Sequence, residues 1–246
     1  MRRRFDLVIA DVDGCLTPET PDLFDIRSLA KIREYNELAL RNEDRPMITV
    51  CTGRPQPFAE AICRIIGNDR VPCVAENGVW LYHPGTNDYY IDPAITDDDL
   101  IMVDEARRWL RKTYDPLGLT AQPGKTASIS LYNPDRNALL AAIPKIENEF
   151  AAKGWNFRVS SSWYYINCDL PHVNKSAGIK RLFDISGIRR DRAAGIGDTF
   201  GDRFIADEVA YFTCPANAED AIKPRAHYIS SLPEIEGVLD ILEHLR

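Results

Sequence analysis

The sequence lacks a long apolar run, an excess of positive charge and a repeated or low-complexity segment. No apolar stretch approaches the roughly 20 residues that a helix needs to cross a bilayer, so we expect no membrane partner. The formal net charge of −7 argues against a nucleic-acid partner, because nucleic-acid-binding proteins usually present a basic face. The basic start, Met1–Arg4, precedes an apolar stretch that ends at Asp11, which is too short for a signal peptide.

Cysteine pairs of the Cys-x-x-C type are also absent. The six cysteines are scattered along the chain, which is typical of reduced, buried thiols and predicts a cytoplasmic protein. The length of 246 residues suffices for one large domain or two modest ones. Whether the protein is a monomer or a homodimer is left open.

Short apolar runs alternate with helical patterns at both ends of the chain. Strands are expected at 5–10, 47–51, 71–75, 193–197, 209–213 and 228–229, and helices at 25–40, 57–66, 175–183 and 234–245. This alternation predicts right-handed βαβ units and a parallel sheet.

The middle of the chain has a different pattern. Helices are expected at 97–114 and 135–153, and strands at 128–132, 155–159 and 163–168, with Ser160–Ser162 as the turn between the last two. This order predicts an inserted α+β lobe. The fold class is therefore α/β, with a Rossmann-like parallel-sheet core at 1–84 and 172–246 and the lobe at 85–171. Linkers are expected near Pro84-Gly85 and Pro171-His172.

Polar residues follow three of the expected core strands. They are Asp11-Val12-Asp13-Gly14, Thr52-Gly53-Arg54 and the segment Asp198–Asp202. In open parallel sheets, ligands bind at the carboxyl ends of the strands. Carboxylates gathered there repel one another unless a cation joins them, and oxygen ligands with little His or Cys nearby suit Mg²⁺. A carboxylate can also be a nucleophile that forms an aspartyl phosphate.

Other interpretations of the same residues stay open at this point. An Asp-x-Asp-Gly string is most often a turn with a helix N-cap. A glycosyltransferase-type Asp-x-Asp metal site would not account for Thr52-Gly53-Arg54 or for Lys175. A positive charge at the start of a helix opposes the helix dipole, so a functional role explains Lys175 better than a structural one.

Four motifs in order resemble those of the haloacid dehalogenase superfamily phosphatases. The matching segments are Asp11–Thr17, Thr52–Arg54, Val173–Lys175, and Gly197-Asp198 with Asp202. The inserted lobe has the position and element order of the large α/β cap domain of the Cof-type group, which includes sugar-phosphate and phosphoglycolate phosphatases. The resemblance covers essentially the whole chain, and the ordered set is far more specific than any single motif.

The resemblance implies a role for each catalytic residue. Asp11 is the expected nucleophile and a Mg²⁺ ligand. Asp13 is the expected general acid and base, and it would bind Mg²⁺ through its backbone carbonyl. Thr52 would donate a hydrogen bond to the phosphoryl group, and Lys175 would offset negative charge on the nucleophile and the phosphate.

The resemblance also implies the rest of the metal site. Asp198 is an expected Mg²⁺ ligand, and Asp202 is either a ligand or a residue that holds one. The sequence departs from the group at Gly201, where an Asn is usual. Because Gly offers no side-chain amide, the positioning of phosphate or metal is expected to differ there.

The remaining candidates are contacts to the substrate. They are Gly53, Arg54, Asn77 and Lys125, with Arg158 and His172 as further polar positions in the lobe. Arg54 could instead cap an element or pair with Glu76, and Asn77-Gly78 is more often a tight turn. A solvated charge is the alternative for Lys125.

Together these residues predict a Mg²⁺-dependent phosphomonoester hydrolase that forms an aspartyl-phosphate intermediate. Its partner would be a small phosphorylated metabolite, such as a sugar phosphate or a phosphoglycolate-like compound. The alternatives are a phosphomutase or phosphotransferase of the same superfamily, in which a second hydroxyl replaces water, and a non-catalytic phospho-acceptor protein that kept the fold.

Overall fold

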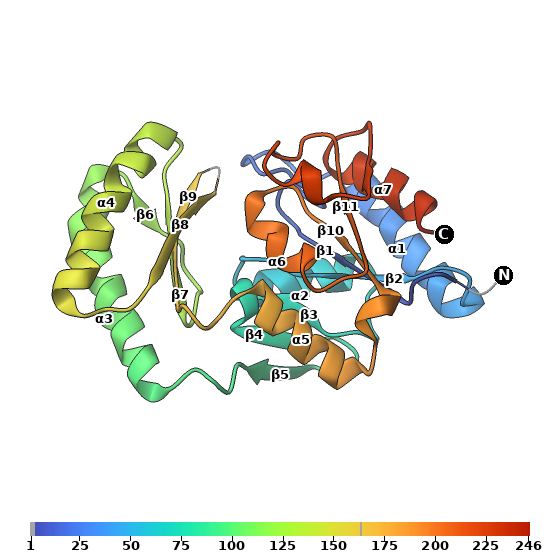
Figure 1. The fold of residues 1–246 in the computed structure, drawn as a ribbon, viewed down its shortest axis with the longest axis horizontal. Coiled ribbons are helices and arrows are strands. Elements are labelled where there is room, and N and C mark those ends of the chain that lie inside the picture. The colour runs from blue at the N-terminus through green and yellow to red at the C-terminus, as the bar shows by residue number, and fades with distance from the viewer. Residues whose placement is uncertain (1–2, 163) are drawn as a thin grey trace.

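The computed structural model describes residues 3–162 and 164–246 and has two lobes (Figure 1). The larger lobe, which we call the core, contains both chain ends, and the smaller lobe, which we call the cap, contains the middle of the chain. Trp163, which was expected to begin a cap strand, lies outside the described residues.

The core is built on a parallel sheet of five strands in the order β12-β11-β10-β1-β2. Their bounds are Tyr228–Ile229, Tyr211–Cys214, Ala193–Ile196, Leu7–Ala10 and Met47–Val50, in the same order. Leu7 of the interior strand β1 pairs with Ala193 on one side and Met47 on the other. The predicted α/β fold with a parallel sheet is confirmed.

Helices cover both faces of this sheet. The first face packs on α1 (Ile26–Asn42), α2 (Gln56–Ile65) and α7 (Glu234–His244), and the second on α5 (Lys175–Ser186) and α6 (Arg203–Ala206). Residues of β1 point alternately to the two faces: Val8 packs on the first face, and Leu7 and Ile9 pack on the second. Strands buried on both faces are continuously apolar, which explains why they were visible in the sequence.

A three-stranded antiparallel sheet, β3-β4-β5, was not predicted as such. It comprises Cys73–Ala75, Trp80–His83 and Asp88–Ile91, and a single bridge between Cys51 and Val74 joins β3 to the end of β2. The predicted linker at Pro84-Gly85, which is also the predicted start of the lobe, falls at the turn between β4 and β5. Because β5 still pairs with β4, we propose that the cap starts after Ile91.

The cap is a four-stranded antiparallel sheet, β6-β7-β9-β8, backed by two helices. Its elements are α3 (Asp97–Tyr114), β6 (Thr120–Ala121), β7 (Ser128–Tyr132), α4 (Arg136–Lys153), β8 (Arg158–Ser162) and β9 (Tyr165–Asp169). One face of this sheet packs its apolar residues, among them Ile129 and Ile166, against α3 and α4.

Two details of the cap prediction were wrong. The strand expected at 155–159 runs over Arg158–Ser162 instead, and Ser160–Ser162 is therefore a strand rather than a turn. The cause is pairing: these serines lie opposite Asn167, Ile166 and Tyr165 of β9, and this ladder outweighs the weak strand preference of serine.

All six cysteines are buried, and none forms a disulfide. No helix in the described part of the chain combines the length and apolarity that a membrane span requires.

Candidate active site

Asp11 lies immediately after β1, where the sheet meets the cap. Its backbone N–H donates to the carbonyl of Ile196 at 3.0 Å, which continues the pairing of β1 with β10. The chain then turns sharply, and the carbonyl of Val12 accepts hydrogen bonds from three N–H groups farther along the turn. Gly14 has φ +75°, and a Cβ there would lie 2.1 Å from Oδ2 of Asp198. The turn therefore needs glycine both for its conformation and for its contact with Asp198.

Lys175 is the first residue of α5, and its helix is held close to the core turn at Glu76–Gly78. The side chain of Asn174 caps the helix by accepting the N–H of Ala177 at 3.0 Å. A Cβ on Gly78 would lie 2.4 Å from the carbonyl oxygen of Asn174, so only glycine allows this approach. The helix start thereby points a buried ammonium group at the carboxyl end of the sheet.

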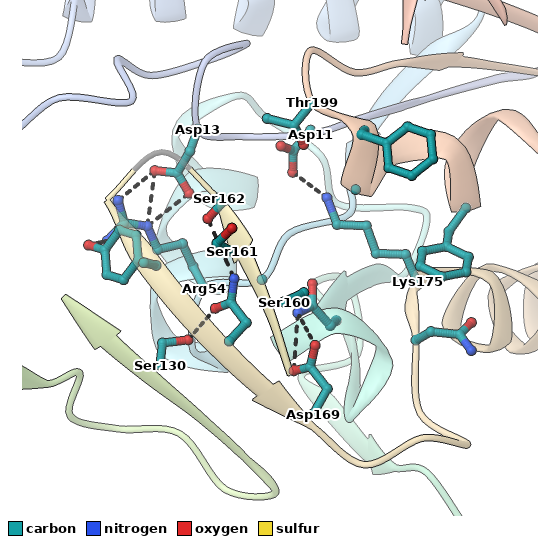
Figure 2. Close-up of a pocket in the computed structure, with 18 of the residues that line it drawn as sticks. Asp11, Asp13, Arg54, Ser130, Ser160, Ser161, Ser162, Asp169, Lys175 and Thr199 are labelled. Atoms are coloured by element: carbon teal, nitrogen blue, oxygen red, sulfur yellow. Dashed lines mark hydrogen bonds and ion pairs between the residues drawn. The ribbon is translucent and has the colours of Figure 1, made fainter. Parts of the chain in front are cut away.

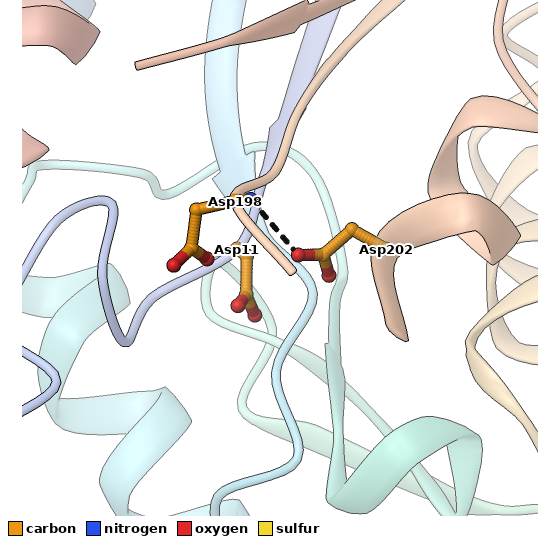
Figure 3. A group of neighbouring side chains, drawn as sticks. All are labelled: Asp11, Asp198 and Asp202. Carbon is orange, nitrogen blue, oxygen red and sulfur yellow. Dashed lines mark hydrogen bonds between the residues drawn. The ribbon is translucent and has the colours of Figure 1, made fainter. Parts of the chain in front are cut away.

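Asp11, Asp198 and Asp202 form the carboxylate cluster shown in Figure 3. One ligand oxygen from each lies within 4.8 Å of the others. Lys175 Nζ donates to Oδ1 of Asp11 at 2.8 Å and to Oδ1 of Asp202 at 2.7 Å. When all four groups are ionised, three negative charges face one positive charge, so two negative charges remain. One divalent cation would balance these two negative charges.

The three carboxylates differ in how their oxygens are used. Asp202 Oδ2 accepts the N–H groups of Asp198 and Thr199, both at 3.0 Å, so both oxygens of Asp202 have protein donors. Asp198 Oδ2 is buried and has no hydrogen-bond partner among the described residues. A buried carboxylate oxygen without a partner is costly, and a hard cation would satisfy it. The donor set therefore fits a hard divalent cation such as Mg²⁺, which Asp198 and Asp11 would hold through side-chain oxygens while Asp202 would support them.

The pKa values point the same way. Burial raises the pKa of Asp11 to about 7, with a further contribution from the charge of Asp202, while Lys175 opposes the shift. Burial, with Asp202 and Asp11 nearby, holds the pKa of Asp198 well above its usual range. Without a metal ion, the cluster is thus short of positive charge.

Asp13 is paired with Arg54. The Arg54 guanidinium donates Nε to Oδ2 of Asp13 at 2.8 Å and Nη2 to Oδ1 at 2.6 Å. The alternative pairing of Arg54 with Glu76 was wrong. Arg54 instead also donates to the hydroxyl of Tyr165 in the cap at 3.3 Å. The predicted general acid is therefore held by an arginine that touches both lobes, and its proposed backbone contact with Mg²⁺ stays a prediction.

Most of the other predicted residues line the cavity, and one is buried behind the cavity wall. Gly53, Asn77 and Lys125 line the cavity. Thr52 is fully buried, and its Oγ1 accepts the N–H of Arg54 at 3.0 Å, so in this conformation it shapes the loop from behind. Asn77 Nδ2 donates to the carboxylate of Asp169 in the cap at 3.3 Å. Gly201, the position where the resemblance implies that an Asn is usual, also lines the cavity.

The cavity has a volume of about 380 Å³ and lies between core and cap (Figure 2). Its cap wall is the polar face of the cap sheet. Strand alternation places on it Arg158, Ser160 and Ser162 from β8, Tyr165, Asn167 and Asp169 from β9, and Ser130 from β7. This wall can donate and accept many hydrogen bonds, whereas the apolar residues of the sheet lie on the opposite face and pack on helices.

Lys125 is the most deeply buried cation of the cap wall. Its Nζ donates to Ser130 Oγ at 2.5 Å, and that hydroxyl donates to Asn167 Oδ1 at 2.5 Å. No carboxylate of the described residues forms an ion pair with Lys125, whereas Arg158 pairs with Asp169. Burial lowers the pKa of Lys125. His172, the other lobe candidate, is 3.9 Å from Asp99 and does not line the cavity.

Sequence reasoning missed several residues of the site. Glu19 lines the cavity, and burial, with the charges of Asp13 and Asp11 nearby, raises its pKa to about 8. It follows the first motif in an irregular loop, where no periodicity could mark it. The polar positions of β8 and β9 did carry a signal, because Arg158-x-Ser160-x-Ser162 and Tyr165-x-Asn167-x-Asp169 alternate with period two.

Comparison with known proteins identifies the family. The model of the haloacid dehalogenase-like hydrolases matches residues 85–242, which is more than half of the chain. The chain belongs to this family. The match includes Lys175, Asp198 and Asp202, and the predictions of a superfamily member and of an enzyme are confirmed.

Individual relatives align with this chain over nearly its full length. A phosphoglycolate phosphatase of Saccharolobus solfataricus is 23% identical over 97% of this chain and 95% of its own. One of Methanopyrus kandleri is 25% identical over 97% and 96%. A crystal structure of a Thermoplasma acidophilum protein has a TM-score of 0.76 at 19% identity and covers 98% of both chains. A haloacid dehalogenase-like hydrolase of Bacteroides thetaiotaomicron has a TM-score of 0.71 at 15% identity and covers 98% of this chain and 100% of its own. These two structures show that the fold is shared.

Proposed function

We propose that this hydrolase is a Mg²⁺-dependent phosphatase that cleaves a small phosphomonoester through an aspartyl phosphate on Asp11. The observation that carries the proposal is the contact of Lys175 with Asp11 beside the unpartnered oxygen of Asp198. A nucleophilic carboxylate next to a transferring phosphoryl group needs fixed positive charge on both sides. Lys175 supplies one side, and Asp198 would hold the metal ion on the other.

The reaction proceeds in two steps on the chain's own residues. In the first, an oxygen of Asp11 attacks phosphorus, the bond from phosphorus to the leaving oxygen breaks, and Asp13, which enters this step protonated, gives that oxygen its proton. In the second, Asp13 takes a proton from water, the water oxygen attacks phosphorus, and Asp11 leaves as a carboxylate. Bound Mg²⁺ would offset the negative charge of the phosphoryl oxygens.

Arg54 contributes to these reaction steps because it holds Asp13. The two nitrogens of its guanidinium fix the Asp13 carboxylate at 2.6–3.0 Å, and the same side chain reaches Tyr165 of the cap. The contact with Arg54 suits the ionised Asp13, which acts as the base in the second step, and it connects Asp13 to the cap. Closure of the cap would exclude water, as lids do in many enzymes.

The cavity supports a proposal for the substrate class. Its volume of about 380 Å³ suits a small metabolite and excludes a polymer. The buried Lys125, which lacks a carboxylate partner among the described residues, would bind an anionic group on the leaving alcohol. The relatives named phosphoglycolate phosphatases support a phosphorylated carboxylic acid, and the hydroxyl-bearing wall also accommodates a sugar phosphate.

The test is the substitution Asp11→Asn, which keeps the shape of the side chain and removes its nucleophilic charge. We expect it to abolish Mg²⁺-dependent hydrolysis of an aryl phosphate while the circular dichroism spectrum stays unchanged. The matched control is Asp220→Asn, whose side chain is 97% exposed; it should retain wild-type activity. Full activity of Asp11→Asn would overturn the mechanism.

A panel of phosphorylated metabolites, assayed with Mg²⁺ and including phosphoglycolate and hexose phosphates, would identify the substrate. Product analysis in the same assay separates hydrolysis from transfer. Free phosphate supports the phosphatase, whereas a phosphate isomer without free phosphate would indicate a phosphomutase.

A further inference from the structure

Glu76 lies in the core but binds the cap. It directly follows β3, is fully buried, and has the unusual φ of +51°. Its Oε1 accepts the N–H groups of Thr126 and Ala127 at 2.8 Å and that of Ser128 at 2.9 Å, together with the Ser128 hydroxyl at 3.0 Å. Three consecutive backbone N–H groups of the cap thus converge on one carboxylate of the core. The reaction steps described above do not use this residue.

The same cap segment is held from its other side by Arg107 of α3. Nη2 of Arg107 donates to the carbonyls of Lys125 and Thr126 at 3.1 Å and to that of Ser128 at 3.4 Å. The N–H groups of residues 126–128 therefore face a carboxylate, and neighbouring carbonyls face a guanidinium. Hydrogen bonds to charged groups are among the stronger ones in proteins. We call residues 125–128 the clamped segment.

Lys125 is the first residue of this clamped segment, so the clamp determines where its side chain starts. The preceding Gly124 packs beside Pro55 of the core, with its potential Cβ 3.6 Å from the Pro55 Cβ. Core contacts thus lie on both sides of Lys125 in sequence, although Lys125 belongs to the cap. Its ammonium group then meets Ser130 inside the cavity.

The turn that carries Glu76 also reaches the phosphate end of the site. Asn77, the next residue, lines the cavity, and Gly78 packs on Asn174, which precedes Lys175. One three-residue turn therefore contacts the helix start that presents Lys175 and the cap segment that presents Lys125. Two cations of the cavity are positioned through the same element.

We propose that Glu76 is a positioning residue that fixes Lys125 at a set separation from the phosphoryl site, so that the enzyme selects phosphomonoesters with an anionic group at that separation. The inference rests on the proposed function, since it deepens the role of the cavity in substrate choice. It predicts that Glu76 affects substrates with a second anionic group and leaves substrates without one unchanged. A purely structural role would affect both kinds alike.

The experiment compares phosphoglycolate, which carries a carboxylate, with an aryl phosphate, which carries none. The variants are Glu76→Gln, Lys125→Met and the double variant, with Glu105→Gln on the exposed side of α3 as the matched control. Loss of a charged hydrogen bond predicts an increase in KM for phosphoglycolate of about tenfold or more in each single variant. In Glu76→Gln, KM and kcat for the aryl phosphate should stay within about twofold. With phosphoglycolate, the double variant should match Lys125→Met because the two residues act in series.

Two further readouts do not depend on turnover. Amide hydrogen exchange of Thr126, Ala127 and Ser128 should be faster in Glu76→Gln than in the wild type. Calorimetry should show weaker phosphoglycolate binding in both single variants. If Glu76→Gln does not fold, Arg107→Gln releases the same segment from its other side and gives the same test.

Equal losses on both substrates, or independent losses that multiply in the double variant, would overturn the inference. Unchanged amide exchange in Glu76→Gln would overturn it as well. A wild-type protein that hydrolyses neither compound would overturn the proposed function, and the exchange and calorimetric results would then decide the inference on their own.

Discussion

Replacement of Lys175 by methionine tests the electrostatic account of the carboxylate cluster. Methionine has a similar length but no charge, so Asp11 and Asp202 would lose the ammonium group that lies 2.8 and 2.7 Å from them. Removing one partner of a buried ion pair costs about 3–5 kcal/mol, because the other charge remains buried. We expect Lys175→Met to lower the free energy of unfolding by about that amount at pH 8 without metal.

The loss of unfolding free energy in Lys175→Met should be larger at high pH than at low pH. The pKa of Asp11 is raised to about 7 in the folded protein. At a pH between the usual pKa of an aspartate, about 4, and 7, the folded state therefore binds a proton that the unfolded state has released. This contribution favours folding at low pH and is lost as the pH rises through 7. The destabilisation by Lys175→Met should therefore be smaller at pH 5 than at pH 8, and Mg²⁺ should recover part of it at pH 8.

Urea denaturation followed by circular dichroism gives the required free energies. The matched control is Lys180→Met on the same helix, whose side chain is 64% exposed and pairs with Glu208 at 3.4 Å. A surface pair of this kind contributes at most about 1 kcal/mol. Equal destabilisation by the two variants, or a loss at Lys175 that is the same at both pH values, would refute the reasoning.

Two further predictions concern the metal site. Mg²⁺ affinity should increase as the pH rises through 7, because Asp11 must release its proton to become a ligand. Calorimetry in two buffers of different ionisation enthalpy measures the released proton, and a binding enthalpy that is the same in both would contradict this. Gly14→Ala should weaken Mg²⁺ binding and destabilise the protein by about 1–3 kcal/mol, since its Cβ would meet Asp198 Oδ2 at 2.1 Å. Isothermal titration measures the Mg²⁺ affinity, and urea denaturation measures the stability. Wild-type Mg²⁺ affinity in Gly14→Ala would show that metal binding does not need glycine at this position.

The parts of the fold that were predictable have local causes. Strands β1, β2 and β10 are buried on both faces, so each appears as a mainly apolar run. Helix α3 matches its predicted bounds because Thr96 and Asp99 form a capping box at its start. Such features depend on neighbouring residues alone, and the sequence displays them directly.

The parts that were missed depend on contacts between distant segments. β4 and β5 are strands because they pair with each other next to β3, and β5 is largely exposed, so it lacks an apolar pattern. The role of Glu76 depends on a segment 50 residues later. No local pattern separates this glutamate from an ordinary residue before an Asn-Gly turn.

The site shows the same division. The motifs identified Asp11, Lys175, Asp198 and Asp202 as a group, and the structure brings these four together. The sequence left open whether Asp202 is a ligand or a support. In the structure, Asp202 Oδ2 accepts two backbone N–H groups, which favours the supporting role, and this arrangement depends on the conformation of the loop after β10.

The central claim is that Asp11 becomes phosphorylated during turnover. The most direct measurement mixes the protein with Mg²⁺ and phosphoglycolate, quenches the reaction in acid within milliseconds, and maps phosphorylated peptides by mass spectrometry. Our account predicts one phosphoryl group on Asp11, absent from Asp11→Asn and removed on further incubation. A phosphoryl group on another residue, or hydrolysis without any phosphorylated residue, would contradict it.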